Sequence, residues 1–135
     1  MFFKKKDNDQ KVDFLINICA LLIHAAKIDQ DYTLQEEDII KKTLLELGLK
    51  KENVSNTIKE AKIIEENSNQ ILDFTREVKN LSDQEKIKIV EALWSIIYSN
   101  KDADIYETNL MRRLAGLLYI DSKTMGDIKS RIKKN

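Results

Sequence analysis

The sequence predicts an all-α protein: about seven helices in a single compact bundle built from two pseudo-repeats. Its 135 residues include no proline and only three glycines, so the two residue types that most often interrupt helices are nearly absent. Apolar residues of the longer segments recur every three or four positions, which is the period of an amphipathic helix. No segment shows the alternation of apolar and polar residues that is typical of a strand.

Length and charge limit the class of protein. A chain of this size can bury about two-thirds of its unfolded surface in one core. The 23 basic and 23 acidic residues balance, which argues against a general nucleic-acid binder. The single cysteine, Cys19, excludes an internal disulfide and favours a reducing compartment, so we expect the cytoplasm. The longest apolar run, residues 15–28, contains three polar residues and is too short to cross a bilayer.

The chain is expected to begin with a flexible tail over residues 1–9. A single all-helical domain should follow over residues 10–135. The first helix should run from about Gln10 to Ile28, and the second should open at Thr33 and close at Gly48, because glycine readily adopts a left-handed conformation. The first helix presents an apolar stripe formed by Val12, Leu15, Ile16, Cys19, Leu22, Ile23 and Ala26. A polar surface helix from Glu52 to about Glu66 follows, with a narrow buried edge drawn from Val54, Ile58, Ala61, Ile63 and Ile64.

The second half is expected to contain a short helix around residues 71–78 and then three longer ones. Ser82 and Glu85 form a capping box that opens a long helix, which we expect to be central and to bury Trp94. A further capping box, Asp104 with Glu107, opens the next helix. Asp121 or Ser122 can cap the last one, which should turn Met125, Ile128 and Ile132 inward.

Two acidic stretches lie at the starts of corresponding helices. Residues 29–38 (DQDYTLQEED) carry five carboxylates and no basic residue, and a weaker copy lies 71 residues downstream. The oxygen-bearing side chains of Asp29, Asp31, Thr33 and Glu36 align with those of Asn100, Asp102, Asp104 and Glu107. The flanking apolar residues align as well, which indicates an internal duplication.

Oxygen ligands at alternating loop positions, completed by a carboxylate from the next helix, suit a hard cation such as calcium or magnesium. The spacing is not that of an EF-hand, since Leu34 and Ile105 stand at the sixth position, where that loop has glycine. A metal-free explanation is also open. The acids of the first turns can be ordinary capping boxes, and Asp29 and Asp31 can be solvated loop acids.

An apolar helix, an acidic loop, a glutamate at the third helical position and two basic residues occur twice in this all-helical chain. This pattern resembles the TerB-like family, named for a tellurite-resistance protein. The likeness covers about Val12 to Ile132 and is closest in residues 93–120, LWSIIYSNKDADIYETNLMRRLAGLLYI. The resemblance implies a seven-helix, pseudo-twofold domain that occurs alone, in stress-linked operons and joined to J-domain co-chaperones.

The resemblance also implies that the two acidic loops face one another as a shared polar or cation-binding centre. Its ligands here would be Asp29, Asp31, Glu36, Asp102, Asp104 and Glu107. The family usually begins each loop with Asp-Gly, whereas this chain has Asp29-Gln30 and Asn100-Lys101. The second loop has thus lost a carboxylate and gained a cation, so we expect the first loop to be the stronger half.

Other candidates favour structural roles. Cys19 and His24 point about 140° apart on one helix, and no third group is specified to orient them. Arg112 and Arg113 can steady the loop acids, bind an anion or remain solvated. An enzyme working through paired carboxylates would need a concave pocket and an acid of raised pKa. The sequence contains no phosphate-binding loop, Cys/His cluster or catalytic triad order, so we expect no enzyme.

The sequence therefore predicts a non-enzymatic TerB-like stress-response module. Its acidic inter-helix loops would bind a divalent cation, calcium or magnesium, and engage a protein partner. The alternative is a metal-free interaction domain of co-chaperone or scaffold type. We expect no other cofactor, no nucleic acid and at most weak peripheral membrane association through the N-terminal MFFKKK.

Overall fold

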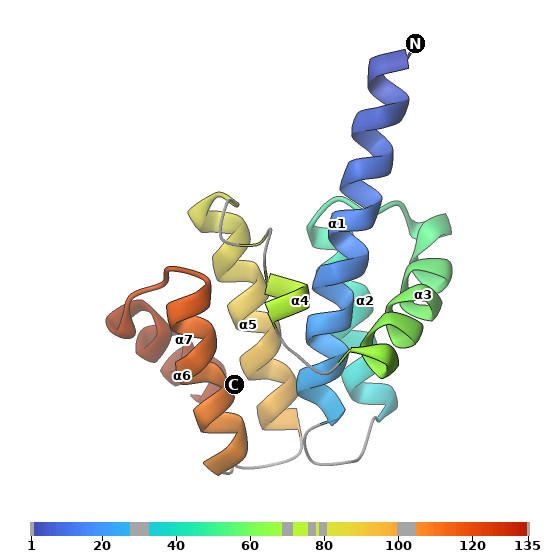
Figure 1. The fold of residues 1–135 in the computed structure, drawn as a ribbon. Helices are drawn as coiled ribbons and strands as arrows, with labels where there is room; N and C mark the ends of the chain where they lie inside the picture. Colours follow the sequence, from blue (N-terminus) through green and yellow to red (C-terminus); the bar gives the residue numbers. More distant parts are fainter. Residues whose placement is uncertain are drawn as a thin grey trace.

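The computed structural model describes the backbone of residues 2–27, 33–68, 72–75, 78, 81–99 and 105–134. Within these ranges it describes the side chains of residues 14–133, except those of residues 72, 73 and 105–107. These residues form helices and turns and contain no strand, which confirms the all-α prediction (Figure 1). The helices are α1 (Phe2–Lys27), α2 (Leu34–Glu46), the 3-10 turn η1 (Lys51–Asn53), α3 (Val54–Asn67), α4 (Leu72–Thr75), α5 (Asp83–Ser99), α6 (Ile105–Leu117) and α7 (Ser122–Lys134). None of these described helices is long and apolar enough to cross a membrane.

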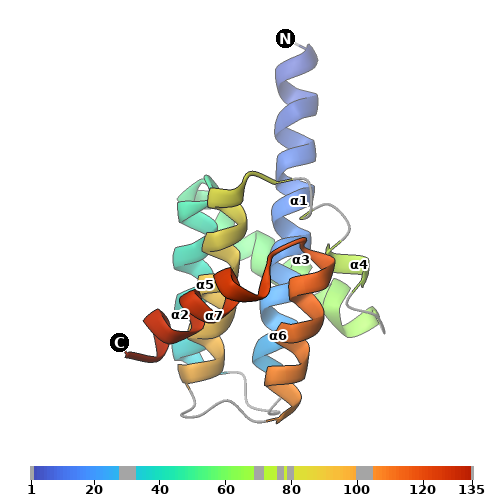
Figure 2. The same ribbon diagram turned by 90° about the vertical axis from the view of Figure 1, so that its left-hand side faces the viewer.

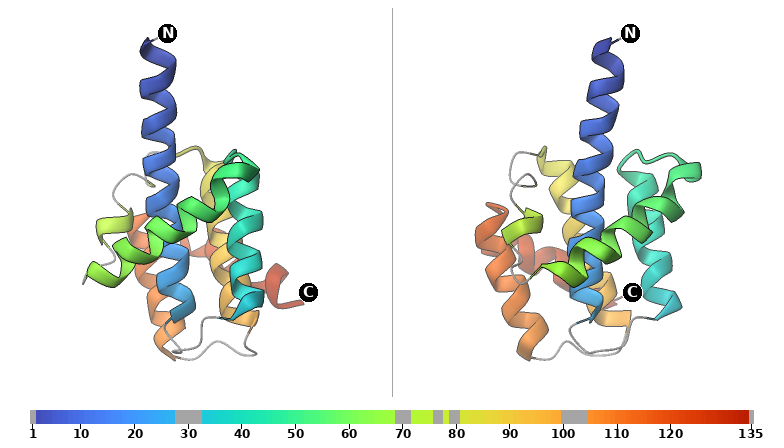
Figure 3. Two further views of the ribbon diagram at one scale, coloured as in Figure 1. Left: turned by 90° about the vertical axis from the view of Figure 1, so that its right-hand side faces the viewer. Right: turned by 45° about the vertical axis from the view of Figure 1, so that its right-hand side comes forward.

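Helix α1 forms the axis of the bundle. Its C-terminal half contacts α2, α3, α4 and α5, and Figure 3 shows α3 crossing over it. Between Leu15 and Ala26 only Asn17 and His24 are not fully buried, so the predicted apolar stripe is narrower than the buried surface. A helix surrounded on all sides buries residues around its whole circumference rather than along one stripe.

The predicted start of α1 near Gln10 is wrong, because the helix begins at Phe2. No glycine or proline separates these positions, and lysine and glutamine are good helix formers, so nothing in the sequence stops the helix at Asp7 to Asp9. The N-terminal part of α1 extends beyond the other helices (Figures 1 and 2).

Helix α3 lies on the surface with one narrow buried edge, as expected. Val54, Ile58 and Ala61 are buried, together with Thr57. Ile63 is instead 52% exposed, because it lies about 200° around the helix from Ala61. Ile64 is also exposed, so the predicted edge is wrong over the last turns of this helix.

Helix α5 is central, as predicted, and packs against α1, α2 and α7. Its capping box is present, since Ser82 Oγ accepts from the Glu85 amide at 3.2 Å and the Ser82 amide donates to Glu85 Oε1 at 3.4 Å. The buried hydrophobic residues of this helix are Ile89, Val90, Ala92, Leu93, Trp94, Ile96 and Ile97.

The internal duplication is visible in the backbone. Helices α2 and α6 have the same length, 13 residues, and the second lies 71 positions after the first. Their C-terminal ends also match: Leu49 N donates to Leu44 O at 3.0 Å, and Ile120 N donates to Ala115 O at 2.9 Å. These are the long hydrogen bonds of a Schellman motif. The packing of α3 on α1 recurs as the packing of α7 on α5.

Candidate functional site at the acidic end of the bundle

The two acidic stretches connect helix ends on the same side of the molecule. Helix α1 ends and α2 begins at the end of the bundle where α5 ends and α6 begins (Figures 1 and 2). Two helix N-termini, whose dipoles favour negative charge, are therefore presented at this end. The fold thus brings the starts of α2 and α6 to the same end of the bundle.

Glu36 is the candidate ligand whose side chain the structure describes. Its amide donates to Thr33 Oγ1 at 3.1 Å, and its Oε1 accepts from the Thr33 amide at 2.8 Å. This reciprocal pair is the predicted capping box. The residue is only 1% exposed, so a carboxylate is held inside the molecule beside the first turn of α2.

The remaining candidate ligands, Asp29, Asp31, Asp102, Asp104 and the side chain of Glu107, lie outside the described residues. The backbone of Glu107 occupies the third position of α6, as Glu36 does in α2, so the fold places these two residues equivalently in the two repeats. Within the described part of the chain, no group of three or more His, Cys, Asp or Glu side chains could hold a metal ion. The six-residue ligand set stays a prediction.

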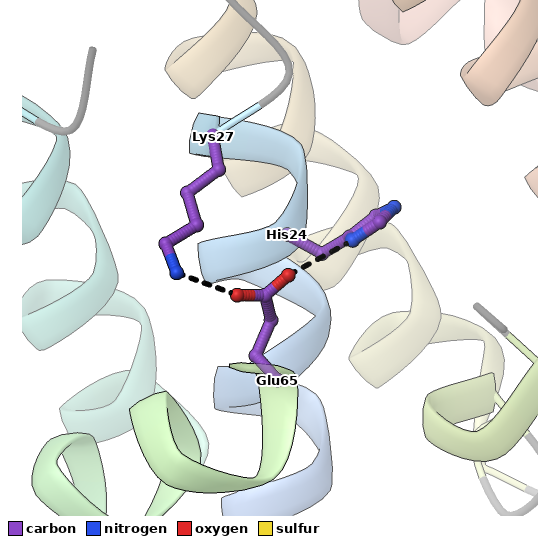
Figure 4. A network of polar contacts seen from close by, with 3 residues as sticks. All are labelled: His24, Lys27 and Glu65. Atoms are coloured by element: carbon purple, nitrogen blue, oxygen red, sulfur yellow. Dashed lines mark hydrogen bonds and ion pairs between the residues drawn. The ribbon is translucent and has the colours of Figure 1, made fainter. Parts of the chain in front are cut away.

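The structure adds a polar cluster that the sequence did not reveal. Glu65 of α3 accepts hydrogen bonds from Lys27 Nζ at 2.8 Å and from His24 Nδ1 at 3.2 Å (Figure 4). A carboxylate can only accept, so the His24 nitrogen is the donor. His24 and Lys27 lie three residues apart on α1 and therefore on one face, which was the signal available in the sequence.

In the Glu65 cluster, the basic partners offset the cost of burying the carboxylate. The side chain of Glu65 is 11% exposed. This burial by itself raises the pKa of its carboxyl, but the hydrogen bonds from Lys27 and His24 outweigh it, and the pKa of Glu65 is lowered. The two basic residues also lie in the last turn of α1, where positive charge complements the helix dipole. The cluster holds a carboxylate ionised and joins α1 to α3.

Cys19 has the properties of a structural core residue. It is fully buried, and this burial raises the pKa of its thiol to about 12. A thiol with this pKa is not ionised at neutral pH and is a poor nucleophile. His24 is directed to Glu65 and lies beside Phe74, with ring centroids 6.4 Å apart. These contacts agree with the structural roles expected for both residues.

Comparison with known proteins identifies the family. The family model described as tellurite resistance protein TerB matches residues 15–130, which include both acidic stretches and both repeats. Searches of curated proteins and of solved structures returned no match. Because the family model covers most of the chain, and the fold is the helical bundle that the resemblance implied, the chain belongs to the TerB family.

Proposed function

We propose that the protein is a non-enzymatic, cytoplasmic stress-response module whose acidic end binds calcium or magnesium and then engages a partner protein. The ligands would be Asp29, Asp31, Glu36, Asp102, Asp104 and Glu107. The observation that supports this proposal is Glu36, a carboxylate buried at the end of the bundle where both acidic stretches connect their helices.

The geometry of Glu36 fits a ligand role. Its contact with the Thr33 amide fixes the side chain in one orientation before any cation arrives. A carboxylate has about four lone-pair sites on two oxygens, so one such group can both cap a helix and coordinate a cation. Oxygen ligands are what both calcium and magnesium require. Asn100 and Lys101 weaken the second stretch, so the first should contribute most of the affinity.

The metal-free alternative also has a specific observation in its favour. The Thr33–Glu36 box is complete without an ion, and Ser82 with Glu85 forms the same motif at the start of α5. In this second candidate function, the acids form a surface for a basic partner protein. Capture of that partner would weaken with added salt, because charges are screened over about 8 Å at physiological ionic strength. Chelators would have no effect on it.

The test uses Glu36→Gln, which retains an oxygen acceptor for the Thr33 amide but removes the negative charge. The thermal unfolding midpoint is measured on chelator-stripped protein with and without millimolar calcium or magnesium. Binding to the native state alone stabilises by about 2.7 kcal/mol when the ligand is at 100 times its Kd. We expect the wild-type midpoint to rise by several degrees and the variant to lose most of that rise.

Glu85→Gln is the matched control, because it changes the same position of a capping box at the start of α5. Its cation response should equal that of the wild type. A wild-type midpoint that ignores both cations would reject the cation site and leave the metal-free candidate, which chelator-resistant, salt-sensitive partner capture would then support. A full response in Glu36→Gln would show that Glu36 is not a ligand.

A further inference from the structure

A second candidate site lies among α5, α6 and α7. Its lining is apolar and basic, in contrast to the acidic end of the bundle. The pocket has a volume of about 220 Å³. Its apolar walls come from Trp94 of α5, Met111 of α6 and Met125 of α7. All three side chains belong to the buried core, so the apolar wall of the pocket is part of the hydrophobic core.

The charged groups that line this pocket are positive. Arg112 of α6 and Lys129 of α7 both line it, and no described Asp or Glu does. Lys129 Nζ lies 5.3 Å from the centre of the Trp94 ring, within the range of a cation–π contact. Asp121, which is nearby in sequence, is engaged elsewhere because it caps α7 through the Thr124 amide at 2.6 Å. An apolar pocket with a cationic rim favours a ligand that has an apolar body and a negative charge.

The indole of Trp94 supplies a further polar group. The side chain is 97% buried, since only 3% of the residue is exposed, and its Nε1 has no hydrogen-bond partner among the described residues. Buried indole N–H groups usually have an acceptor. The pocket also contains Met111 and Met125, whose unbranched side chains adjust easily, so its walls can adapt to the shape of a ligand.

We propose that the pocket binds a small organic carboxylate, with its apolar chain against Trp94, Met111 and Met125 and its carboxylate at Arg112 and Lys129. Arginine and lysine make strong, charge-assisted hydrogen bonds to carboxylates. The volume equals that of roughly seven water molecules at about 30 Å³ each, which suits a chain of about six carbons. The ligand class is therefore a short-chain fatty acid, for which hexanoate is the probe.

The protein carries its own reporter for this test, because Trp94 is the only tryptophan. Hexanoate is titrated against Trp94 fluorescence, with 1-hexanol as the uncharged analogue and inorganic phosphate as an anion without an apolar chain. We expect a saturable change with hexanoate and at least about tenfold weaker responses with the other two. The double variant Arg112→Gln with Lys129→Gln should raise the Kd for hexanoate about tenfold, a loss of about 1.4 kcal/mol.

Two further variants keep the outcome decisive. Arg113→Gln is the matched control: it removes the adjacent, exposed arginine that does not line the pocket, and it should leave the Kd unchanged. Gly126→Leu should abolish binding, because Gly126 lines the pocket and an added Cβ there meets nothing within 4 Å, so the new side chain has room to occupy it.

Several results would overturn the proposal. Equal affinity for hexanol would show a purely hydrophobic contact, and equal affinity for phosphate would show a plain anion patch. A loss of affinity in Arg113→Gln as large as in the double variant, or unchanged binding in Gly126→Leu, would place the ligand elsewhere. Absence of any hexanoate effect on both Trp94 fluorescence and the thermal unfolding midpoint would show that the pocket does not bind this class.

Discussion

Glu65 joins two helices through one carboxylate. Its oxygens accept from Lys27 at 2.8 Å and from His24 at 3.2 Å, and both partners belong to the last turn of α1. The partners are more than a third exposed, so much of their hydration survives in the folded state. The contribution of the cluster to stability should therefore be modest and depend on the ionisation of Glu65.

Glu65→Gln tests this contribution through its pH dependence. The pKa of Glu65 is lowered in the folded protein from an ordinary value of 4.5, so its stabilising effect is present above that value and is lost as the pH falls through the lowered pKa. We expect the variant to be about 1 kcal/mol less stable than the wild type at neutral pH. The difference should shrink towards zero as the pH falls through the lowered pKa. Urea unfolding at neutral and at acidic pH measures it.

Glu66→Gln is the control for that experiment, because it alters the exposed neighbour of Glu65. It should change stability much less at neutral pH. A Glu65→Gln deficit that persisted unchanged in acid would show that packing, not ionisation, accounts for the effect.

Single residues were predictable from the sequence where their chemistry is local. The Thr33–Glu36 box spans three positions and was foreseen in full. The partners of Glu65 lie 38 and 41 positions away, and only the packing of α3 on α1 brings them together. For the same reason, the pocket beside Trp94, whose Nε1 has no partner in the described part of the chain, could not be read from a pattern that correctly placed Trp94 in the core.

The ends of α2 and α6 show how one type of helix terminus can be built with different residues. The turn that closes α2 places Gly48 in a left-handed conformation, with a φ of 103°, as the sequence predicted. Helix α6 uses the same hydrogen-bond pattern, but its left-handed residue is Tyr119, with a φ of 57°. Tyrosine rarely adopts this conformation, so the residue type gave no sign of the turn.

Two Gly→Ala substitutions should have opposite effects on stability. Gly48→Ala forces alanine into a left-handed conformation and should destabilise the protein by about 1 kcal/mol. Gly116→Ala lies inside α6, where the added Cβ meets nothing within 4 Å, and should stabilise the protein by up to about 1 kcal/mol through helix propensity. Denaturant unfolding of the two variants provides the comparison. Effects of the same sign would contradict the assigned backbone conformations.

Helix existence was easier to predict than helix boundaries or faces. The segments that became α2, α5, α6 and α7 begin at the positions their caps indicated. The start of α1 was missed because the helix was expected to begin only near Gln10, although no residue before it breaks a helix. Ile63 was placed on the buried edge of α3 from its apolar character, but the edge is set by what α3 packs against.

At the scale of the whole molecule, the two repeats share one core. The buried cluster contains Leu22 of α1 and Leu44 of α2 together with Leu93 of α5 and Leu114 of α6. Helix α5 contacts α1 and α2 as well as α7, so the first repeat cannot lose its structure without exposing apolar surface of the second. We therefore expect the protein to unfold as a unit.

Unfolding followed by two probes checks this expectation. Far-UV circular dichroism reports on all helices, whereas fluorescence reports on Trp94, which lies in the second repeat. The two probes should give the same midpoint and the same slope in a urea titration, as a two-state transition requires. A Trp94 transition that preceded or followed the loss of helix would show that the repeats are separate units.

Glu65 also links the end of α1 to α3 close to the acidic end of the bundle. It fastens the last turns of α1 to α3 immediately before residues 28–32, which lead into α2. Binding of an ion or a protein at those residues would act on a helix end that is bonded to α3, so we expect its effect to reach α3 as well as α1. Amide hydrogen exchange in the last turn of α3 would then sense events at the acidic end, although α3 contributes none of the proposed ligands.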